Sequence, residues 1–128
     1  MGQYILVLDQ GSLNSSAFLV DSHAKIITRS DYPLKPRVLR SGWIEYKPDD
    51  ILKSQLSALK ALFRKIGSKK QQIAALGISG QHSTIVLWDK ETGKPVYNAI
   101  SYSDPRGIDI CRQRTGRRDI VRERTGLH

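Results

Sequence analysis

Two short apolar runs separated by a polar turn constrain the fold of this chain more than any other feature. The first run, residues 4–8, ends at Asp9-Gln10-Gly11-Ser12, and the second run, residues 17–20, begins five residues later. This spacing predicts two strands joined as a β-hairpin. A glycine lets the backbone approach an anion closely, and successive N–H groups of a turn can face it. The hairpin is therefore a candidate phosphate-binding turn; an ordinary hairpin with a hydrophilic turn is the alternative.

Asp9 closes the first apolar run and is a candidate magnesium ligand. Mg²⁺ keeps much of its hydration shell in proteins, so a single carboxylate can hold it through water. The three histidines and the single cysteine, Cys111, are scattered without the spacing of a zinc site. One cysteine cannot form an internal disulfide, and the cytoplasm is therefore the expected location.

The pattern along the rest of the chain predicts strands that alternate with helices. A third strand is expected at 26–30, so that the first three strands form an antiparallel meander. Apolar residues recur at three- and four-residue spacing between Pro48, a good first residue of a helix, and Gly67, a good C-cap. The near-continuous apolar run 73–78 predicts a strand that is buried on both faces of a sheet.

The C-terminal third is predicted to begin with a hairpin and to continue as helix. The hairpin strands are expected at 84–88 and 95–101, a helix from Asp104-Pro105 to about Gly116, and a short helical stretch around 119–124. The predicted order is thus βββαβ, a hairpin, and then α. Trp43, Trp88 and Cys111 are expected to be buried, as these residue types usually are.

The net charge of +9 raises the question of a nucleic-acid or membrane partner. Seven arginines and three acidic residues lie between Arg106 and Arg124, but no aromatic residue interleaves with them as base stacking requires. We expect a solvated face, or a face that meets a partner domain, and no nucleic-acid partner. No apolar run approaches the roughly 20 residues of a membrane span, so no membrane partner is expected.

Four segments together resemble the N-terminal part of the FGGY family of carbohydrate kinases. They are Asp9-Gln-Gly-Ser12, Gly42-Trp-Ile-Glu45, Gly77-Ile-Ser-Gly-Gln81 and Glu91-Thr-Gly-Lys-Pro-Val-Tyr-Asn-Ala-Ile100. The resemblance runs in order from about Gln3 to Leu127, and it is strongest to the glycerol kinase and xylulose kinase branches. It implies an α/β, ribonuclease-H-like fold, as in the actin, hexokinase and sugar-kinase superfamily. It also implies ATP-dependent transfer of a phosphoryl group to a hydroxyl of a sugar, polyol or sugar acid.

The resemblance assigns residues of this chain to two halves of one site. Asp9 is expected at the magnesium ion and the ATP phosphates. The phosphate turn is expected to consist of Gly11, Ser12, Leu13 and Asn14. The contacts with the sugar are expected from Gln81, His82, Ser83, Tyr102 and Asp104.

Some positions depart from the family pattern. Glycerol kinases carry an arginine–glutamate pair where this chain has His82-Ser83, and a tryptophan where it has Tyr102, which disfavours glycerol and favours a larger sugar or sugar acid. The phosphate turn of the family carries two threonines and a later arginine, and here Ser12, Leu13 and Ser16 stand in their places. Nucleotide affinity is expected to rest mainly on the backbone donors of the turn.

The resemblance also implies that residues 1–128 are the N-terminal part of the first kinase domain. The family's general-base aspartate, its adenine-binding segments and its second domain lie beyond residue 128. No catalytic residue is therefore expected in this segment, which should be inactive alone and should act with the missing C-terminal part. A stand-alone, non-catalytic sugar- or nucleotide-binding module is the alternative. A homo-oligomer is possible through the truncated sheet edge.

Overall fold

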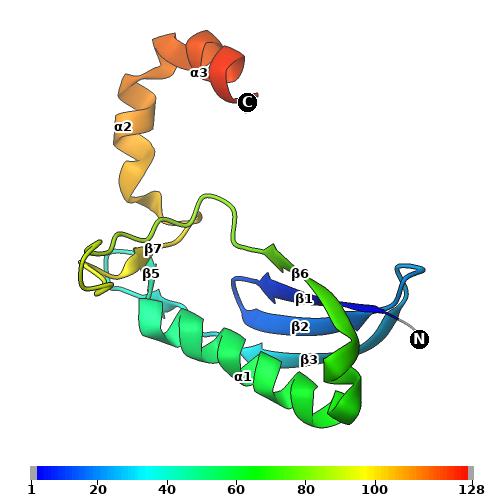
Figure 1. Ribbon diagram of the computed structural model, residues 1–128. Coiled ribbons are helices and arrows are strands. Elements are labelled where there is room, and N and C mark those ends of the chain that lie inside the picture. Colours follow the sequence, from blue (N-terminus) through cyan, green and yellow to red (C-terminus); the bar gives the residue numbers. More distant parts are fainter. Residues whose placement is uncertain (1–2, 127–128) are drawn as a thin grey trace.

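The computed structural model describes residues 3–126 and contains a four-stranded sheet covered by one long helix (Figure 1). The strands of this sheet lie in the order β3-β2-β1-β6. Their bounds are β1 Tyr4–Gln10, β2 Asn14–Val20, β3 Ile26–Pro33 and β6 Ile73–Ser79. β1, β2 and β3 form an antiparallel meander, and β6 lies parallel to β1. The predicted βββαβ order is confirmed.

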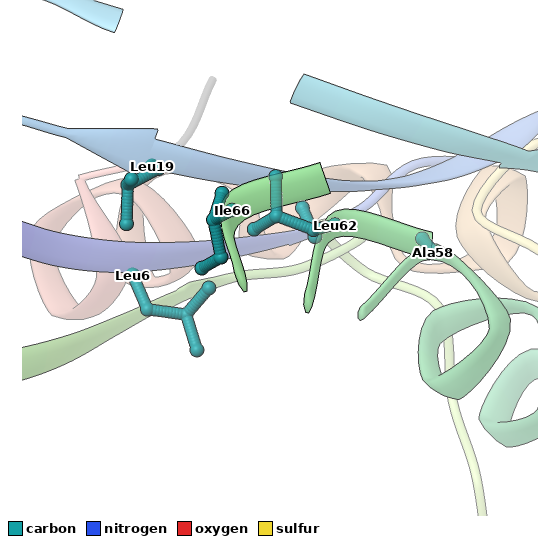
Figure 2. Packing of buried hydrophobic residues seen from close by; sticks show 6 residues of the cluster. Leu6, Leu19, Ala58, Leu62 and Ile66 are labelled. Atoms are coloured by element: carbon teal, nitrogen blue, oxygen red, sulfur yellow. The ribbon is translucent and has the colours of Figure 1, made fainter. Parts of the chain in front are cut away.

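Helix α1, Pro48–Ile66, joins the meander to β6 through a short 3-10 helix, η1, Gly67–Gln72. Proline in its first turn, two acidic residues next to it and Gly67 at its C-cap (φ 53°) set its ends. Its buried face packs on the sheet: Ala58, Leu62 and Ile66 of α1 form the main hydrophobic core with Leu6, Ala17 and Leu19 (Figure 2).

A second, three-stranded sheet lies beside the N-terminal end of α1 and was not predicted. It consists of β4 Arg37–Val38, β5 Ile44–Tyr46 and β7 Ala99–Ile100, in the order β4-β5-β7. Leu34, Tyr46 and Ala99 form its small core. The expected hairpin of 84–88 and 95–101 is present in part: the two segments pair through isolated antiparallel bridges, Ile85 with Ile100 and Trp88 with Pro95, and the predicted strands are too long because only β7 forms a strand there. Along its other edge, β7 pairs antiparallel with β5.

The C-terminal segment extends away from both sheets (Figure 1). It contains η2 Pro105–Gly107, α2 Ile108–Gln113, η3 Thr115–Arg117 and α3 Arg118–Thr125. The expected continuous helix to Gly116 is broken at Arg114, whose φ is −108°. Residues 108–126 are exposed, because this segment extends away from the sheets and from α1 (Figure 1). Burial of Cys111 was therefore wrongly predicted. Leu127 and His128 lie outside the described residues.

Strand β6 is less buried than the sequence predicts. Leu76 and Ile78 are 56% and 76% exposed, although the apolar run predicted burial on both faces. They pair with Leu6 and Leu8, so they continue the face on which α1 packs. Because α1 contacts β1, β2 and β3, it leaves this part of the face uncovered. Trp88 is also 62% exposed, contrary to the prediction. Among residues 3–126, no helix is long and apolar enough to span a membrane.

Candidate functional site

The carboxyl ends of β1 and β6 open into one cavity of about 320 Å³. The two strands are parallel, and their register sets Asp9 beside Ser79, so both chains leave the sheet at the same edge. Ligands of open α/β sheets bind outside such strand ends. The lining residues are Asp9, Gln10, Gly11, Ser12, Ser79, Gly80, Gln81, His82 and Tyr102.

Six of the ten residues assigned from the resemblance line this cavity: Asp9, Gly11, Ser12, Gln81, His82 and Tyr102. Leu13 and Asn14 belong to the same turn but do not line it. Ser83 follows His82 in a left-handed conformation (φ 60°), outside the cavity wall, and Asp104 also lies outside it. Sequence reasoning missed Gln10, Ser79 and Gly80, although their positions at the two strand ends were a sufficient signal.

The turn after β1 has its carbonyl groups fixed and its N–H groups free of turn partners. The Gly11 carbonyl accepts hydrogen bonds from Nε2 of Gln81 (2.8 Å) and Nε2 of Gln10 (3.1 Å). The Ser12 carbonyl accepts one from the Tyr46 hydroxyl (2.9 Å). Within residues 3–126, no turn or loop hydrogen bond uses the N–H of Gly11, Ser12 or Leu13 as its donor. These N–H groups can therefore serve an anion.

Gly11 and Tyr46 explain how the turn holds this shape. A Cβ atom at position 11 would lie 2.7 Å from the Asn14 carbonyl oxygen, so only glycine fits without a shift of the backbone. Tyr46 is 2% exposed, and burial raises the pKa of its hydroxyl, which keeps the proton that it donates to Ser12. The second sheet thus supports the turn directly.

Asp9 is the only carboxylate in the cavity lining within the described residues. It is half-buried and stands between Ser16 of β2 and Ser79 of β6 in the sheet register. Residues 3–126 contain no group of three or more metal-ligating side chains. The Asp9 carboxylate lies in the same cavity as Gly11 and Ser12 of the turn, so it can hold a Mg²⁺ ion together with water and ligand phosphates, which is the usual way that Mg²⁺ is bound.

Tyr102 lines one side of the cavity, called the Tyr102 wall below, and a buried ionic cluster follows it closely along the chain. Arg106 donates to Glu45 (2.7 Å) and through Nε to Asp104 (2.7 Å), and these two carboxylate side chains are 2% and 1% exposed. Asp104 also accepts the backbone N–H of Ile44 (2.7 Å). The Arg106 guanidinium lowers the pKa of both carboxyl groups, that of Asp104 well below its usual range. Both oxygens of the Asp104 carboxylate therefore accept hydrogen bonds from groups of the protein itself.

Trp43 and Arg106 were both misplaced by sequence reasoning. The Arg106 guanidinium lies 4.2 Å from the centre of the Trp43 ring, which covers one face of the indole. Trp43 is nevertheless 38% exposed, so the prediction of a core tryptophan is wrong. Arg106, placed with the solvated arginines, is instead the one that ties β5 to the C-terminal segment. No local signal marks that pairing, because Glu45 is 61 residues away.

Three features define the fold class of the actin, hexokinase and sugar-kinase superfamily. They are the strand order β3-β2-β1-β6, the helix α1 that connects the meander to β6, and the cavity at the ends of β1 and β6. The sequence profile described as the FGGY family of carbohydrate kinases, N-terminal domain, matches residues 4–128. This chain belongs to the FGGY family of carbohydrate kinases.

The relatives are kinases about four times as long as this chain. A glycerol kinase of Salmonella arizonae is 41% identical over 127 residues, which cover 98% of this chain and 25% of that protein. The crystal structure of Plasmodium falciparum glycerol kinase with ADP has a TM-score of 0.79 and 25% identity, and covers 94% of this chain. A xylulose kinase from Brucella ovis has a TM-score of 0.85 at 23% identity, over 93% of this chain, and supports the fold. The aligned parts are 25% of both chains.

Proposed function

We propose that residues 1–128 are the N-terminal part of the first domain of an ATP-dependent carbohydrate kinase. The longer protein, called the full-length kinase below, transfers the γ-phosphoryl group of ATP to a hydroxyl of a sugar, polyol or sugar acid. The observation that carries this proposal is the single cavity in which the turn after β1 meets the residues after β6. The family membership and the glycerol kinase relatives support it.

In this proposal the chain supplies positioning and charge rather than a covalent step. The free N–H groups of Gly11, Ser12 and Leu13, with Asn14 beside them, receive the ATP phosphates. Asp9 holds Mg²⁺ through water, and the ion neutralises charge on the transferred group. The neighbour with ADP bound supports the nucleotide part of this proposal.

The sugar lies at the other end of the cavity. We assign its contacts to the polar side chain of His82 and to the ring of Tyr102, which covers the apolar face of a carbon chain. Gln81, which lines the cavity, and Ser83, which lies outside it, remain predicted contacts with the sugar. Asp104 stays a prediction from the resemblance, with its carboxylate occupied by Arg106 and Ile44. The relatives named above act on glycerol and xylulose, and the His82-Ser83 pair favours the larger acceptor.

The uncovered part of the large sheet supports the domain assignment. Leu76 and Ile78 are exposed beyond α1, and β6 is an edge strand whose outer hydrogen-bonding groups have no partner strand within residues 3–126. Monomeric proteins rarely leave such an apolar edge open. We assign this edge to the C-terminal remainder of the same kinase, which also brings the general base; residues 1–128 alone are expected to be inactive. Pairing between two copies is the other way to cover it.

We propose a cytoplasmic enzyme, because its exposed Cys111 is compatible with a reducing compartment. The arginines of α2 and α3 have no aromatic residues interleaved with them, so we propose no nucleic-acid partner. No apolar run of the sequence approaches the roughly 20 residues of a membrane span, so we also propose no membrane partner.

Amide hydrogen exchange of the full-length kinase tests the placement of both ligands. Because bound ligands stabilise the groups they contact, Mg²⁺–ATP should slow exchange at residues 10–14, and a sugar acceptor should slow it at 79–84 and 101–104. Peptides from η1, which precedes β6 at the edge of the sheet opposite the cavity, serve as the internal control. Protection by Mg²⁺–ATP at the arginines of α2 and α3, with none at residues 10–14, would contradict the assignment.

A further inference from the structure

We propose that Thr84 is a positioning residue that couples the phosphate turn to the Tyr102 wall of the cavity. The inference rests on the proposed function of that cavity. Thr84 does not line the cavity itself, and its hydroxyl group sits between residues that do.

Three hydrogen bonds form a continuous path across the site. Nε2 of Gln81 donates to the Gly11 carbonyl oxygen (2.8 Å), and the Thr84 hydroxyl donates to Oε1 of Gln81 (2.8 Å). The backbone N–H of Tyr102 donates in turn to the Thr84 hydroxyl oxygen (3.3 Å). The path therefore joins the turn after β1, the segment after β6 and the segment after β7.

The chemistry of the path fixes its direction. The Gly11 carbonyl can only accept, so the Gln81 amide must turn its N–H toward it and its oxygen toward Thr84. The Thr84 hydroxyl must then donate to that oxygen, which leaves its lone pairs for the Tyr102 N–H. A hydroxyl group does both, and a methyl group in its place does neither.

This path changes the role of Gln81. Both ends of its amide are engaged by protein groups, so Gln81 acts as a brace that holds the Gly11 carbonyl out of the anion position. The Gly11 carbonyl and the Ser12 N–H belong to one planar peptide unit and point in opposite directions, so holding the carbonyl there leaves the Ser12 N–H directed to the phosphates. The Thr84 hydroxyl holds the Gln81 amide in this orientation. The same oxygen accepts the Tyr102 N–H, so it also positions the backbone that carries the Tyr102 ring toward the sugar.

Thr84→Val and Thr84→Ser in the full-length kinase form a matched pair of variants. Valine keeps the shape and removes the hydroxyl, whereas serine keeps the hydroxyl. Thr84 belongs to neither hydrophobic core, so both variants should stay folded, with a modest fall in melting temperature for Thr84→Val because it loses two hydrogen bonds. We expect kcat/KM to fall about tenfold in Thr84→Val for ATP and for the sugar alike, and to stay within about twofold of wild type in Thr84→Ser. A Thr84→Val enzyme with wild-type kcat/KM for ATP overturns the coupling.

Amide NMR signals of the kinase without ligands test the coupling independently of turnover. Within residues 3–126 the N–H groups of Gly11, Ser12 and Leu13 have no partner in the turn, so their signals report the shape of the turn rather than a lost hydrogen bond. Thr84→Val should raise hydrogen exchange several-fold at Tyr102 and should also shift the amide signals of residues 10–14, and Thr84→Ser should do neither. A change confined to Tyr102, with the signals of residues 10–14 unchanged, overturns the coupling. If the wild-type kinase transfers no phosphate, the proposed function fails and this pattern still decides the role of Thr84. Gln81→Met breaks the path at its other hydrogen bond and must also shift the signals of residues 10–14, which covers the case of an unfolded Thr84→Val.

Discussion

Asp9→Asn should lower the kcat of the full-length kinase by about 10²–10³-fold, the loss typical when a group that stabilises transition-state charge is removed. Asparagine has the same size but no charge. Asp9 is the only carboxylate of the cavity lining within the described residues, so this exchange removes the charge that we assign to the magnesium ion. Because the ion neutralises the phosphates most strongly during transfer, the loss should fall on kcat more than on the KM for the sugar.

The control for Asp9→Asn is Asp109→Asn in α2. The side chain of Asp109 is 84% exposed, and within residues 3–126 its one ion pair is with the exposed Arg112. An isolated exposed pair contributes little, so this variant should keep wild-type turnover and stability. Steady-state kinetics at saturating Mg²⁺ compare the two. Equal activity of Asp9→Asn and Asp109→Asn would exclude a role of Asp9 at the metal.

The second large effect concerns stability. Leu62 is fully buried between α1 and the large sheet, among Leu6, Leu19 and Ile66 (Figure 2). Leu62→Ala removes its contacts and leaves a cavity, which should cost about 2–5 kcal/mol. Because α1 packs on β2, the same loss should loosen the serine-rich start of β2 that adjoins the phosphate turn.

Leu52→Ala on the same helix is the matched control, because Leu52 is 59% exposed. It should change the free energy of unfolding by less than about 0.5 kcal/mol. Urea unfolding followed by circular dichroism measures both variants. Similar losses from the two substitutions would show that the helix packs on the sheet through another face.

Much of the large sheet and of α1 could be predicted because their signals are local. The spacing of apolar residues, Pro48 and Gly67 mark α1, and the break at Gly11 marks the hairpin. The burial of β6 could not be predicted, because its apolar residues indicate a covered strand while the described elements cover only part of it. β4, β5 and β7 have two or three residues each, too few for any period to show.

In the candidate site too, the residues that carry a local signal could be predicted and those held by distant contacts could not. Asp9, Gly11 and His82 stand at strand ends that the sequence marks, and the structure brings them to one cavity. The supports of that cavity are contacts between distant segments, such as Tyr46 with Ser12, 34 residues apart. Neither partner carries a local signal, so these contacts emerge only from the folded chain.

Phosphoryl transfer from labelled ATP to a panel of alcohols tests the central claim most directly. The panel contains glycerol, xylulose and gluconate, and the samples are the full-length kinase, its Asp9→Asn variant and the 128-residue chain alone. We predict labelled product from at least one alcohol with the full-length kinase, a loss of about 10²–10³-fold with Asp9→Asn, and no product with the isolated chain. No labelled alcohol with the full-length kinase, or robust transfer by residues 1–128 alone, would contradict the account.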